Sequence, residues 1–273
     1  MMQNKLRRPV VVIPLYKNSM TDSERFSFEN TLAILAEHDI CIICPPKICN
    51  YITCIQLKYH QKFDVQYFPN KYFSGISGYN KLLMSACFYK RFIKYEYMLI
   101  VQTDAIVFSD SLVKFCNYGY SYIGAPLFKG LSKPKLPLSF VGVGNGGFSL
   151  RKISDFIAAL SCIKYLSYPD NIYGKTGLVK SIKRFMFSFT HAPFQPILNE
   201  DIFWGMLIPE NFKFFTVPTP EEAIPFAFEV APEYLYKLNG EKLPFGCHAW
   251  EKYNKEFWLN FIHAKYFRTS KKT

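Results

Sequence analysis

Short apolar runs alternate with amphipathic segments along the first third of the chain. Residues 10–13 form a β-branched run that ends at Pro14, which is typical of a buried strand entering a loop. The next segment has apolar residues on one helical face and the spacing of a capping box at Thr21 and Glu24. A second apolar run covers residues 40–44. Strand, helix and strand in this order predict a right-handed βαβ unit and a mostly parallel sheet.

The most strand-like run, residues 97–101, ends at a polar triplet whose last residue is Asp104. We expect one helix before this strand, over residues 80–92, and another soon after Gly147. In open α/β sheets, ligands bind beyond the carboxyl ends of the strands. The pattern therefore places Asp104 where a ligand binds.

Length and composition indicate a single folded domain. The 273 residues are 49% hydrophobic and 18% aromatic, which excludes a disordered chain. No apolar stretch reaches a signal peptide or the roughly 18 residues of a membrane span, so we expect a cytoplasmic protein. Its eight cysteines are then expected to be reduced thiols. Residues 166–196 are polar, basic and weakly periodic, and are predicted to be a variable insertion.

The net charge of +12 predicts an anionic partner. Local concentrations of basic residues occur at Lys180, Lys183 and Arg184 and over residues 265–272, but no nucleic-acid-binding module accompanies them, so nucleic acid is not expected. A phosphorylated substrate and an anionic membrane surface remain. In the last segment, aromatic residues interleave with basic ones, which is typical of an interfacial helix or of a surface helix packed through its aromatic side chains.

A carboxylate at the end of a strand can hold a divalent ion on diphosphate oxygens. Gln102, Thr103 and Asp104 have this position, with Asp104 as the anionic ligand. The alternative is that Asp104 only begins a turn or caps a helix.

Three glycines within residues 144–147 allow the backbone to approach a ligand closely. A plain tight turn would have the same composition. The segment matches neither a Walker loop nor the GxGxxG motif that opens a dinucleotide-binding fold.

Glu200 and Asp201 form an acidic pair at the start of an apolar, aromatic stretch. Such a pair can simply favour the positive end of a helix dipole. It can also supply a general base that takes a proton from an acceptor hydroxyl. The sequence leaves both readings open.

His248 follows Cys247 in a short loop near the end of the chain. A lone histidine is most often a structural hydrogen-bonding residue, but it can also be a metal ligand. Structural zinc on Cys41, Cys44, Cys49 and Cys54 is an alternative, but no second CxxC or HxxxH motif completes a tetrahedral set.

These segments together resemble a bacterial polysaccharide-locus family of GT-A-like glycosyltransferases, from about residue 10 to residue 253. The resemblance rests on the following motifs in this order: Ile13-Pro14-Leu15-Tyr16, Gly78-Tyr79-Asn80, Gln102-Thr103-Asp104-Ala105, Tyr122-Ile123-Gly124-Ala125-Pro126, Gly144 to Arg151, Glu200-Asp201 and Pro244 to His248. The glycine pair, helix and Glu-Asp pair are also similar to inverting β-1,3-galactosyltransferases and fringe-like enzymes.

The resemblance implies an α/β/α sandwich of the GT-A type, built as one Rossmann-like domain. Residues of about 10–130 would bind the nucleotide-sugar and residues of about 131–253 would bind the acceptor, followed by a basic aromatic tail over 254–273. The donor would contact the following residues: Pro14, Leu15, Tyr16, Tyr79, Asn80, Gln102, Thr103, Asp104, Gly146 and Gly147.

The resemblance also implies a mechanism. A divalent metal, Mn²⁺ or Mg²⁺, would sit on Asp104 and His248, although Gln102 replaces the first aspartate of the family's Asp-x-Asp motif and puts metal dependence in question. Asp201 would be the catalytic base beside Glu200, and the sugar would pass with inversion from a UDP-linked donor to a glycan or lipid-linked glycan in surface polysaccharide synthesis. The alternatives are a retaining enzyme of this fold, a nucleotidyltransferase-like enzyme and a non-catalytic carbohydrate-binding protein.

Overall fold

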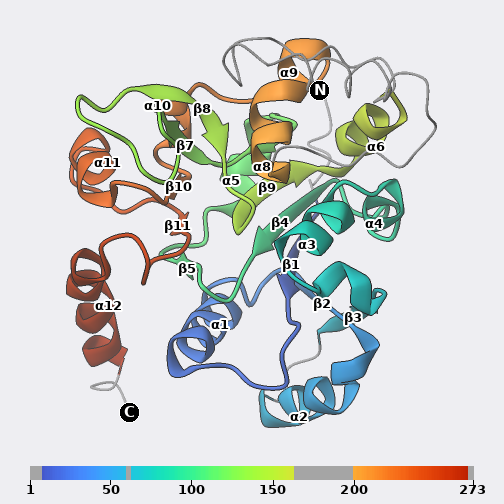
Figure 1. Ribbon diagram of the computed structural model, residues 1–273. Coiled ribbons are helices and arrows are strands. Elements are labelled where there is room, and N and C mark those ends of the chain that lie inside the picture. The colour runs from blue at the N-terminus through green and yellow to red at the C-terminus, as the bar shows by residue number, and fades with distance from the viewer. Residues whose placement is uncertain (1–7, 60–62, 163–198, 270–273) are drawn as a thin grey trace, which may run out of the picture.

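Six strands form the central sheet of the protein, shown as a computed structural model in Figure 1. The structure describes residues 8–59, 63–162 and 199–269, so the predicted insertion at 166–196 lies outside it. The strand order is β3-β2-β1-β4-β9-β6. The strands are β1 (Pro9–Pro14), β2 (Asp39–Cys44), β3 (Asp64–Tyr67), β4 (Tyr97–Val101), β6 (Tyr122–Ile123) and β9 (Phe148–Lys152).

The parallel core of this sheet is the βαβ arrangement that the sequence predicts. β3, β2, β1 and β4 run parallel, and β9 is antiparallel to both β4 and β6. β4 is buried along its whole length, as expected for a strand covered on both faces. The carboxyl ends of β1 and β4 therefore lie side by side at one edge.

Helices cover both faces of the central sheet, and others pack beside it. The segments of this kind are α1 (Asp22–Ile34), α2 (Cys49–Tyr59), α3 (Ile76–Leu83), α4 (Ala86–Lys90), α5 (Leu112–Asn117), α6 (Ile153–Cys162), α8 (Glu200–Ile202), α9 (Ile208–Asn211), α10 (Pro220–Ala223), α11 (Pro232–Leu238) and α12 (Lys255–Thr269). Single turns occur at η1 (Pro46–Ile48) and η2 (Asn70–Phe73), and η5 (Phe203–Leu207) is a π-helix. None of the described helices is long and apolar enough to cross a bilayer.

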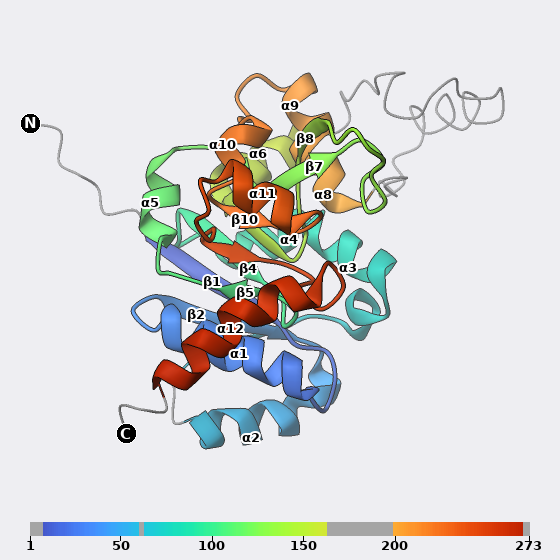
Figure 2. The same ribbon diagram turned by 90° about the vertical axis from the view of Figure 1, so that its left-hand side faces the viewer.

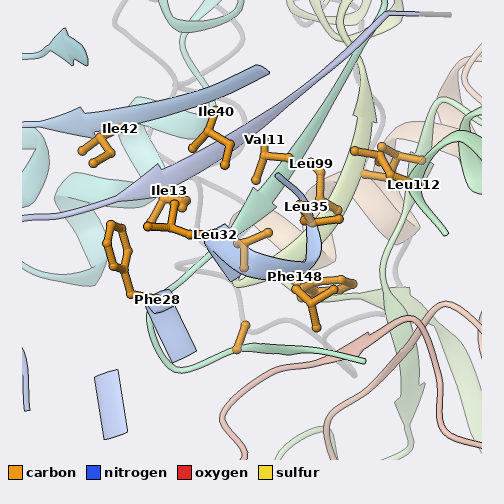
Figure 3. Close-up of a cluster of buried hydrophobic side chains, with 14 of the residues drawn as sticks. Val11, Ile13, Phe28, Leu32, Leu35, Ile40, Ile42, Leu99, Leu112 and Phe148 are labelled. Carbon is orange, nitrogen blue, oxygen red and sulfur yellow. The ribbon is translucent and has the colours of Figure 1, made fainter. Parts of the chain in front are cut away.

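The first face of the sheet packs on α1, α2 and α5. Val11 and Ile13 of β1 point to this side and meet Phe28 and Leu32 of α1, as Figure 3 shows. The capping box that begins α1 is present, since the Glu24 amide donates to Thr21 Oγ1 (3.2 Å) and the Thr21 amide donates to Glu24 Oε2 (2.8 Å). The helix and its apolar stripe are thus as the sequence predicts.

The opposite face packs on α3, α4, α6 and the helical segment from α8 to α9. Val10 and Val12, which alternate with the residues of the first face, belong to this second cluster. The helix expected over residues 80–92 is divided into α3 and α4. The Tyr89 hydroxyl donates to the Leu83 carbonyl (2.7 Å), a group that the end of α3 leaves without a helical partner.

A small second sheet carries the end of the chain back to the central one. Its strands are β10 (Ala227–Phe228), β11 (Gly246–Cys247) and β5 (Ile106–Val107), in that order. β11 is antiparallel to β5, which begins just after Asp104. Beside this sheet stands a hairpin of β7 (Ala125–Phe128) and β8 (Phe140–Gly144). α12 crosses the side of the molecule where α1 lies (Figure 2).

Candidate active site

A cavity lies at the carboxyl ends of β1 and β4, where the parallel pairing brings the following loops together. Its lining is Pro14, Leu15, Tyr16, Lys17, Ser19, Met20, Glu24 and Thr103. Four of these, Pro14, Leu15, Tyr16 and Thr103, are residues for which the sequence predicts contact with the donor. The ends of parallel strands are the usual ligand edge of α/β sheets.

Asp104 and His248 face each other beside this cavity. The Asp104 Oδ1 and His248 Nε2 atoms are 3.3 Å apart, and Asp104 is about half exposed, with 49% of its side chain accessible. His248 follows β11 directly, and its amide donates to the Phe228 carbonyl of β10 (3.1 Å). The two candidate metal ligands therefore flank the paired strands of the small sheet, Asp104 just before β5 and His248 just after β11.

Glu229 orients the imidazole from its other side. The distance between His248 Nδ1 and Glu229 Oε1 is 3.0 Å, so Nδ1 donates to this carboxylate and Nε2 is turned toward Asp104. Burial lowers the pKa of His248, but the neighbouring carboxylates of Asp104 and Glu229 outweigh it and raise the pKa to about 10. Burial likewise opposes ionisation of Asp104, yet His248 holds the pKa of that carboxyl below its ordinary value.

These residues fit a divalent cation. The buried His248 Nε2 makes no hydrogen bond of acceptable geometry within the described part of the chain, although a carboxylate oxygen lies close to it. Imidazole nitrogen and carboxylate oxygen both bind Mn²⁺. No cluster of three or more His, Cys, Asp or Glu side chains forms a metal site among the described residues, so diphosphate oxygens would have to complete the shell.

The structure does not favour a structural zinc site on the four cysteines. Cys41 and Cys44 are buried in β2, whereas Cys49 and Cys54 are exposed on α2. Burial raises the pKa of both Cys41 and Cys44 to about 12, which opposes the thiolate form that zinc requires.

The glycine turn before β9 provides room for the site. A Cβ on Gly147 would lie 2.1 Å from His248 Nε2, and a Cβ on Gly146 would lie 2.7 Å from Glu200 Oε1. The Gly147 carbonyl also accepts from the Gln102 amide (2.8 Å). Gln102 therefore contacts the glycine turn through its backbone amide. Because the two glycines have no side chain, His248 and Glu200 can approach the turn closely.

Glu200 is held in a buried ion pair. Arg151 Nη2 donates to Glu200 Oε1 (2.9 Å), and the side chains are 0% and 3% exposed. Arg151 further donates to Tyr89 and Ser149, so its guanidinium is fixed on several sides. An acid in this position cannot reach an acceptor hydroxyl readily, which favours a positioning role for Glu200.

Asp201 differs from Glu200 although it is the next residue. It is partly exposed, and no described side chain neutralises it as Arg151 neutralises Glu200. Burial, followed by the negative charges of Glu200 and Glu229, raises the pKa of Asp201 to about 7. A carboxylate with this pKa can exchange a proton near neutral pH.

Unpaired polar atoms are concentrated near these carboxylates. Among the described residues, Asn145 Nδ2 and Glu200 Oε2 are buried without a hydrogen-bond partner. The Tyr79 hydroxyl is close to Gln102 but makes no hydrogen bond of acceptable geometry. Asn80 reaches the same region, since its Nδ2 donates to Asn199 Oδ1 (3.4 Å). Buried polar groups of this kind are those that a ligand can satisfy.

The structure thus brings the predicted site residues to one edge of the sheet. Sequence reasoning missed Glu229 and treated Arg151 only as the end of a motif. Only Phe148 and Leu150 are apolar in β9, and a second basic residue follows Arg151, so little in the sequence indicated that Arg151 is buried. Nothing in the sequence indicated Glu229, since an acid between a short strand and a turn is common on protein surfaces.

Comparison with known proteins agrees with this architecture. Residues 62–248 match the family model described as "Protein of unknown function (DUF5672)". The apo structure of mouse xyloside xylosyltransferase 1 superposes with a TM-score of 0.50 at 10% identity, covering 88% of this chain and 97% of that one. It shows the fold, and the predicted GT-A-type α/β/α class is confirmed. No curated protein matches the sequence.

Two further solved structures have lower scores. The apo glycosyltransferase GlyE of Streptococcus pneumoniae TIGR4 has a TM-score of 0.49 at 12% identity, and the match covers 96% of this chain and 64% of that one. A glycosyltransferase involved in glycosylation of the major capsid of PBCV-1 has a TM-score of 0.43 at 11% identity, with 88% and 92% covered.

Proposed function

The chain belongs to the DUF5672 family, and on the basis of its site we propose that it is a glycosyltransferase. It would move a sugar from a nucleotide-sugar donor, of which a UDP-sugar is the first to test, to a carbohydrate or lipid-linked glycan acceptor. The observation that carries the proposal is the joint position of Asp104, His248 and Asp201. Asp104 and His248 form a metal-type pair beside the cavity. Glu229, which contacts His248, also interacts electrostatically with Asp201, whose pKa is raised.

The donor nucleoside would lie against the shallow pocket at the ends of β1 and β4, whose enclosed space of about 10 Å³ holds only a small part of it. Tyr16, which is 45% exposed, offers an aromatic face there, and Thr103 offers a hydroxyl. Lys17 lies in the same lining, and its charge interacts with Asp104. A lysine and a metal pair at one end of this cavity are the features that recognise a diphosphate.

Asp104 and His248 would hold the divalent cation. When bound, such a cation stabilises the charge that develops on the departing diphosphate. Glu229 fixes the tautomer and the direction of the His248 ring, and Gly147 leaves the space that the ring needs.

Asp201 would act as the general base. Its carboxylate accepts the proton of the acceptor hydroxyl, the hydroxyl oxygen forms the new bond to the anomeric carbon, and the bond from that carbon to the nucleoside diphosphate breaks. Attack opposite the leaving group inverts the anomeric configuration. Glu200, fixed by Arg151, would orient the segment that carries Asp201, and its free oxygen together with Asn145 would bind hydroxyls of the donor sugar.

We also propose that the enzyme acts in the synthesis of a surface polysaccharide. A lipid-linked acceptor would place the enzyme at the cytoplasmic face of a membrane, where its net charge of +12 favours anionic lipids. Side chains beyond residue 262, including the basic tail, lie outside the described part of the chain.

A donor screen tests the proposal. The full chain is incubated with UDP-, GDP- and dTDP-linked sugars and Mn²⁺, and release of the nucleoside diphosphate is measured. We expect hydrolysis of one donor class, loss of hydrolysis in EDTA, and loss in Asp104→Ala and His248→Ala. Full activity in EDTA with both variants active would refute the metal assignment, and the absence of hydrolysis or transfer with every donor would refute the glycosyltransferase.

The same assay separates the alternatives. A retaining enzyme gives a product with the donor's anomeric configuration by NMR. A nucleotidyltransferase releases pyrophosphate from a nucleoside triphosphate and a sugar phosphate. A carbohydrate-binding protein consumes no donor.

A further inference from the structure

A second cavity, of about 300 Å³, lies beside the candidate active site and is not used by the proposed donor or metal. Two segments line it, one after β10 and one after β11, with residues Ala231, Pro232, Glu233, Tyr234, Lys252, Tyr253 and Asn254. The volume is at the lower end of the roughly 300–1,000 Å³ of small-molecule sites. It shares no lining residue with the first cavity.

Each of the two segments that line the cavity is connected to the candidate metal pair. Ala231 follows Glu229, the partner of His248, after one intervening residue. Lys252, in the segment that follows His248, interacts electrostatically with Glu229 and Asp104. A molecule in this cavity would therefore lie next to the proposed site of the diphosphate.

The walls combine aromatic surface with groups that bind hydroxyls. Tyr234 is 39% exposed, and its ring packs edge-on against Phe128 with centroids 6.0 Å apart, which holds it in place. Tyr253 is half-buried, with Lys252 Nζ 4.7 Å from the centre of its ring. The carboxylate of Glu233 lies in the same wall.

This composition selects for a saccharide. A sugar ring has apolar C–H faces that pack on aromatic rings, and it has hydroxyls at its edges that both donate and accept hydrogen bonds. Aromatic walls with a few placed polar groups are the general form of such binding sites.

The cavity is preformed in the fold. Ala231 has a φ of +53°, a left-handed conformation that a residue with a Cβ adopts at a cost, and it begins the turn into α11. Asn254 accepts from the Phe257 amide (3.2 Å) at the start of α12 and donates to Glu233 Oε1 (2.8 Å) of α11. Tyr236 of α11 also packs on Phe257, with ring centroids 5.6 Å apart.

We infer that this cavity is the subsite for a sugar unit of the acceptor, with Tyr234 as its stacking surface and Glu233 and Asn254 as its hydroxyl-binding groups. The inference rests on the proposed function, because it assigns the second substrate of the same reaction. Its position beside the metal pair and its separation from the nucleoside cavity give each substrate a site of its own.

The test measures sugar binding apart from donor chemistry. Methyl glycosides of glucose, galactose, N-acetylglucosamine and xylose are used as probes in saturation-transfer NMR with the full chain. We expect at least one to bind, and Tyr234→Ala to weaken that binding by about tenfold. Glu233→Gln, which keeps the shape of the residue, should weaken it as well. Tyr118→Ala, at a tyrosine 48% exposed outside both cavities, is the matched control and should bind as the unaltered chain does.

The results distinguish failure of the proposed glycosyltransferase function from failure of the acceptor subsite alone. Failure of the unaltered chain either to hydrolyse or to transfer from any nucleotide-sugar overturns the proposed function, whatever the glycosides do. Donor hydrolysis combined with no binding of any glycoside, or with equal binding in Tyr234→Ala, Glu233→Gln and the unaltered chain, overturns the acceptor subsite alone. Thermal unfolding of each variant shows whether a loss arises from misfolding.

Discussion

At the scale of single residues, Asp201 is defined by its contrast with the residue before it. Glu200 is neutralised by Arg151 in the interior, whereas Asp201 is partly exposed near two negative charges. Asp201→Asn should lower turnover by about 10²–10⁴-fold, because general-base catalysis contributes that range, and should leave nucleotide affinity nearly unchanged. Turnover with an identified acceptor and calorimetric titration of the nucleotide would check this.

Asp64→Asn, at a surface aspartate of β3, serves as the control and should keep full turnover. An Asp201→Asn enzyme as active as this control would contradict the assignment of the base.

The pH dependence of the reaction follows from the same residue. Burial and the charges of Glu200 and Glu229 raise the pKa of Asp201 to about 7, so the base is protonated and inactive below that pH. The rate should therefore rise by about tenfold per pH unit below pH 7 and level off above it. Pre-steady-state rates across pH 5–9 would measure this profile.

A rate that is flat between pH 5 and pH 7 would show that the catalytic group ionises below this range. Burial raises the pKa of Asp201, so ionisation of this side chain opposes folding. The contribution of protonated Asp201 to folding stability is therefore lost as the pH rises from 3.8 through 7.

Glu229 should matter through His248 rather than by contact with substrate. Removing the charge in Glu229→Gln weakens the orientation of the imidazole, and outer-shell partners of this kind change metal affinity by about 10–100-fold. We expect Mn²⁺ affinity, measured by calorimetry, to fall by that factor. Glu210→Gln, at an exposed position of α9, should not change it. Equal Mn²⁺ affinity in both variants would remove Glu229 from this role.

At the scale of elements, the Arg151 and Glu200 pair joins β9 to α8. Arg151→Met leaves a buried carboxylate without its partner, which typically costs about 3–5 kcal/mol of folding stability. The double variant Arg151→Met/Glu200→Leu should recover part of this loss, because neither charge remains. Urea unfolding would give the three free energies.

The exposed pair of Arg8 and Asp39 is the control for this comparison. Both of its side chains reach solvent, 64% and 44% exposed, so Arg8→Met should cost only about 0–1 kcal/mol. Equal losses in Arg8→Met and Arg151→Met would contradict the argument from burial.

Elements with a strong local signal could be predicted from the sequence, and elements shaped by distant contacts could not. β4 and the capping box of α1 were evident, because each depends on neighbouring residues alone. The division between α3 and α4 coincides with the hydrogen bond from the Tyr89 hydroxyl to the Leu83 carbonyl, which the apolar periodicity does not reveal. The π-helix before Pro209 occurs where that residue cannot donate to the preceding turn, a shift in the ladder that periodicity does not reveal.

At the scale of the whole molecule, the order of motifs predicted the fold class, but the site depends on pairs of residues far apart in the chain. The resemblance named Asp104 and His248 together, and the small sheet is what places them side by side. No local sequence pattern indicates that Gly147 lies against His248 or that Arg151 pairs with Glu200. Roles that arise from such contacts require the structure.

The pairing of β5 with β11 also sets the time at which the site can form during synthesis. Asp104 emerges from the ribosome soon after β4, whereas His248 follows β11 and is synthesised 144 residues later. A nascent chain can therefore fold much of the parallel sheet before it can bring Asp104 and His248 together. The proposed cation-binding pair forms only after β11 has been synthesised, well after the strands that carry the parallel sheet.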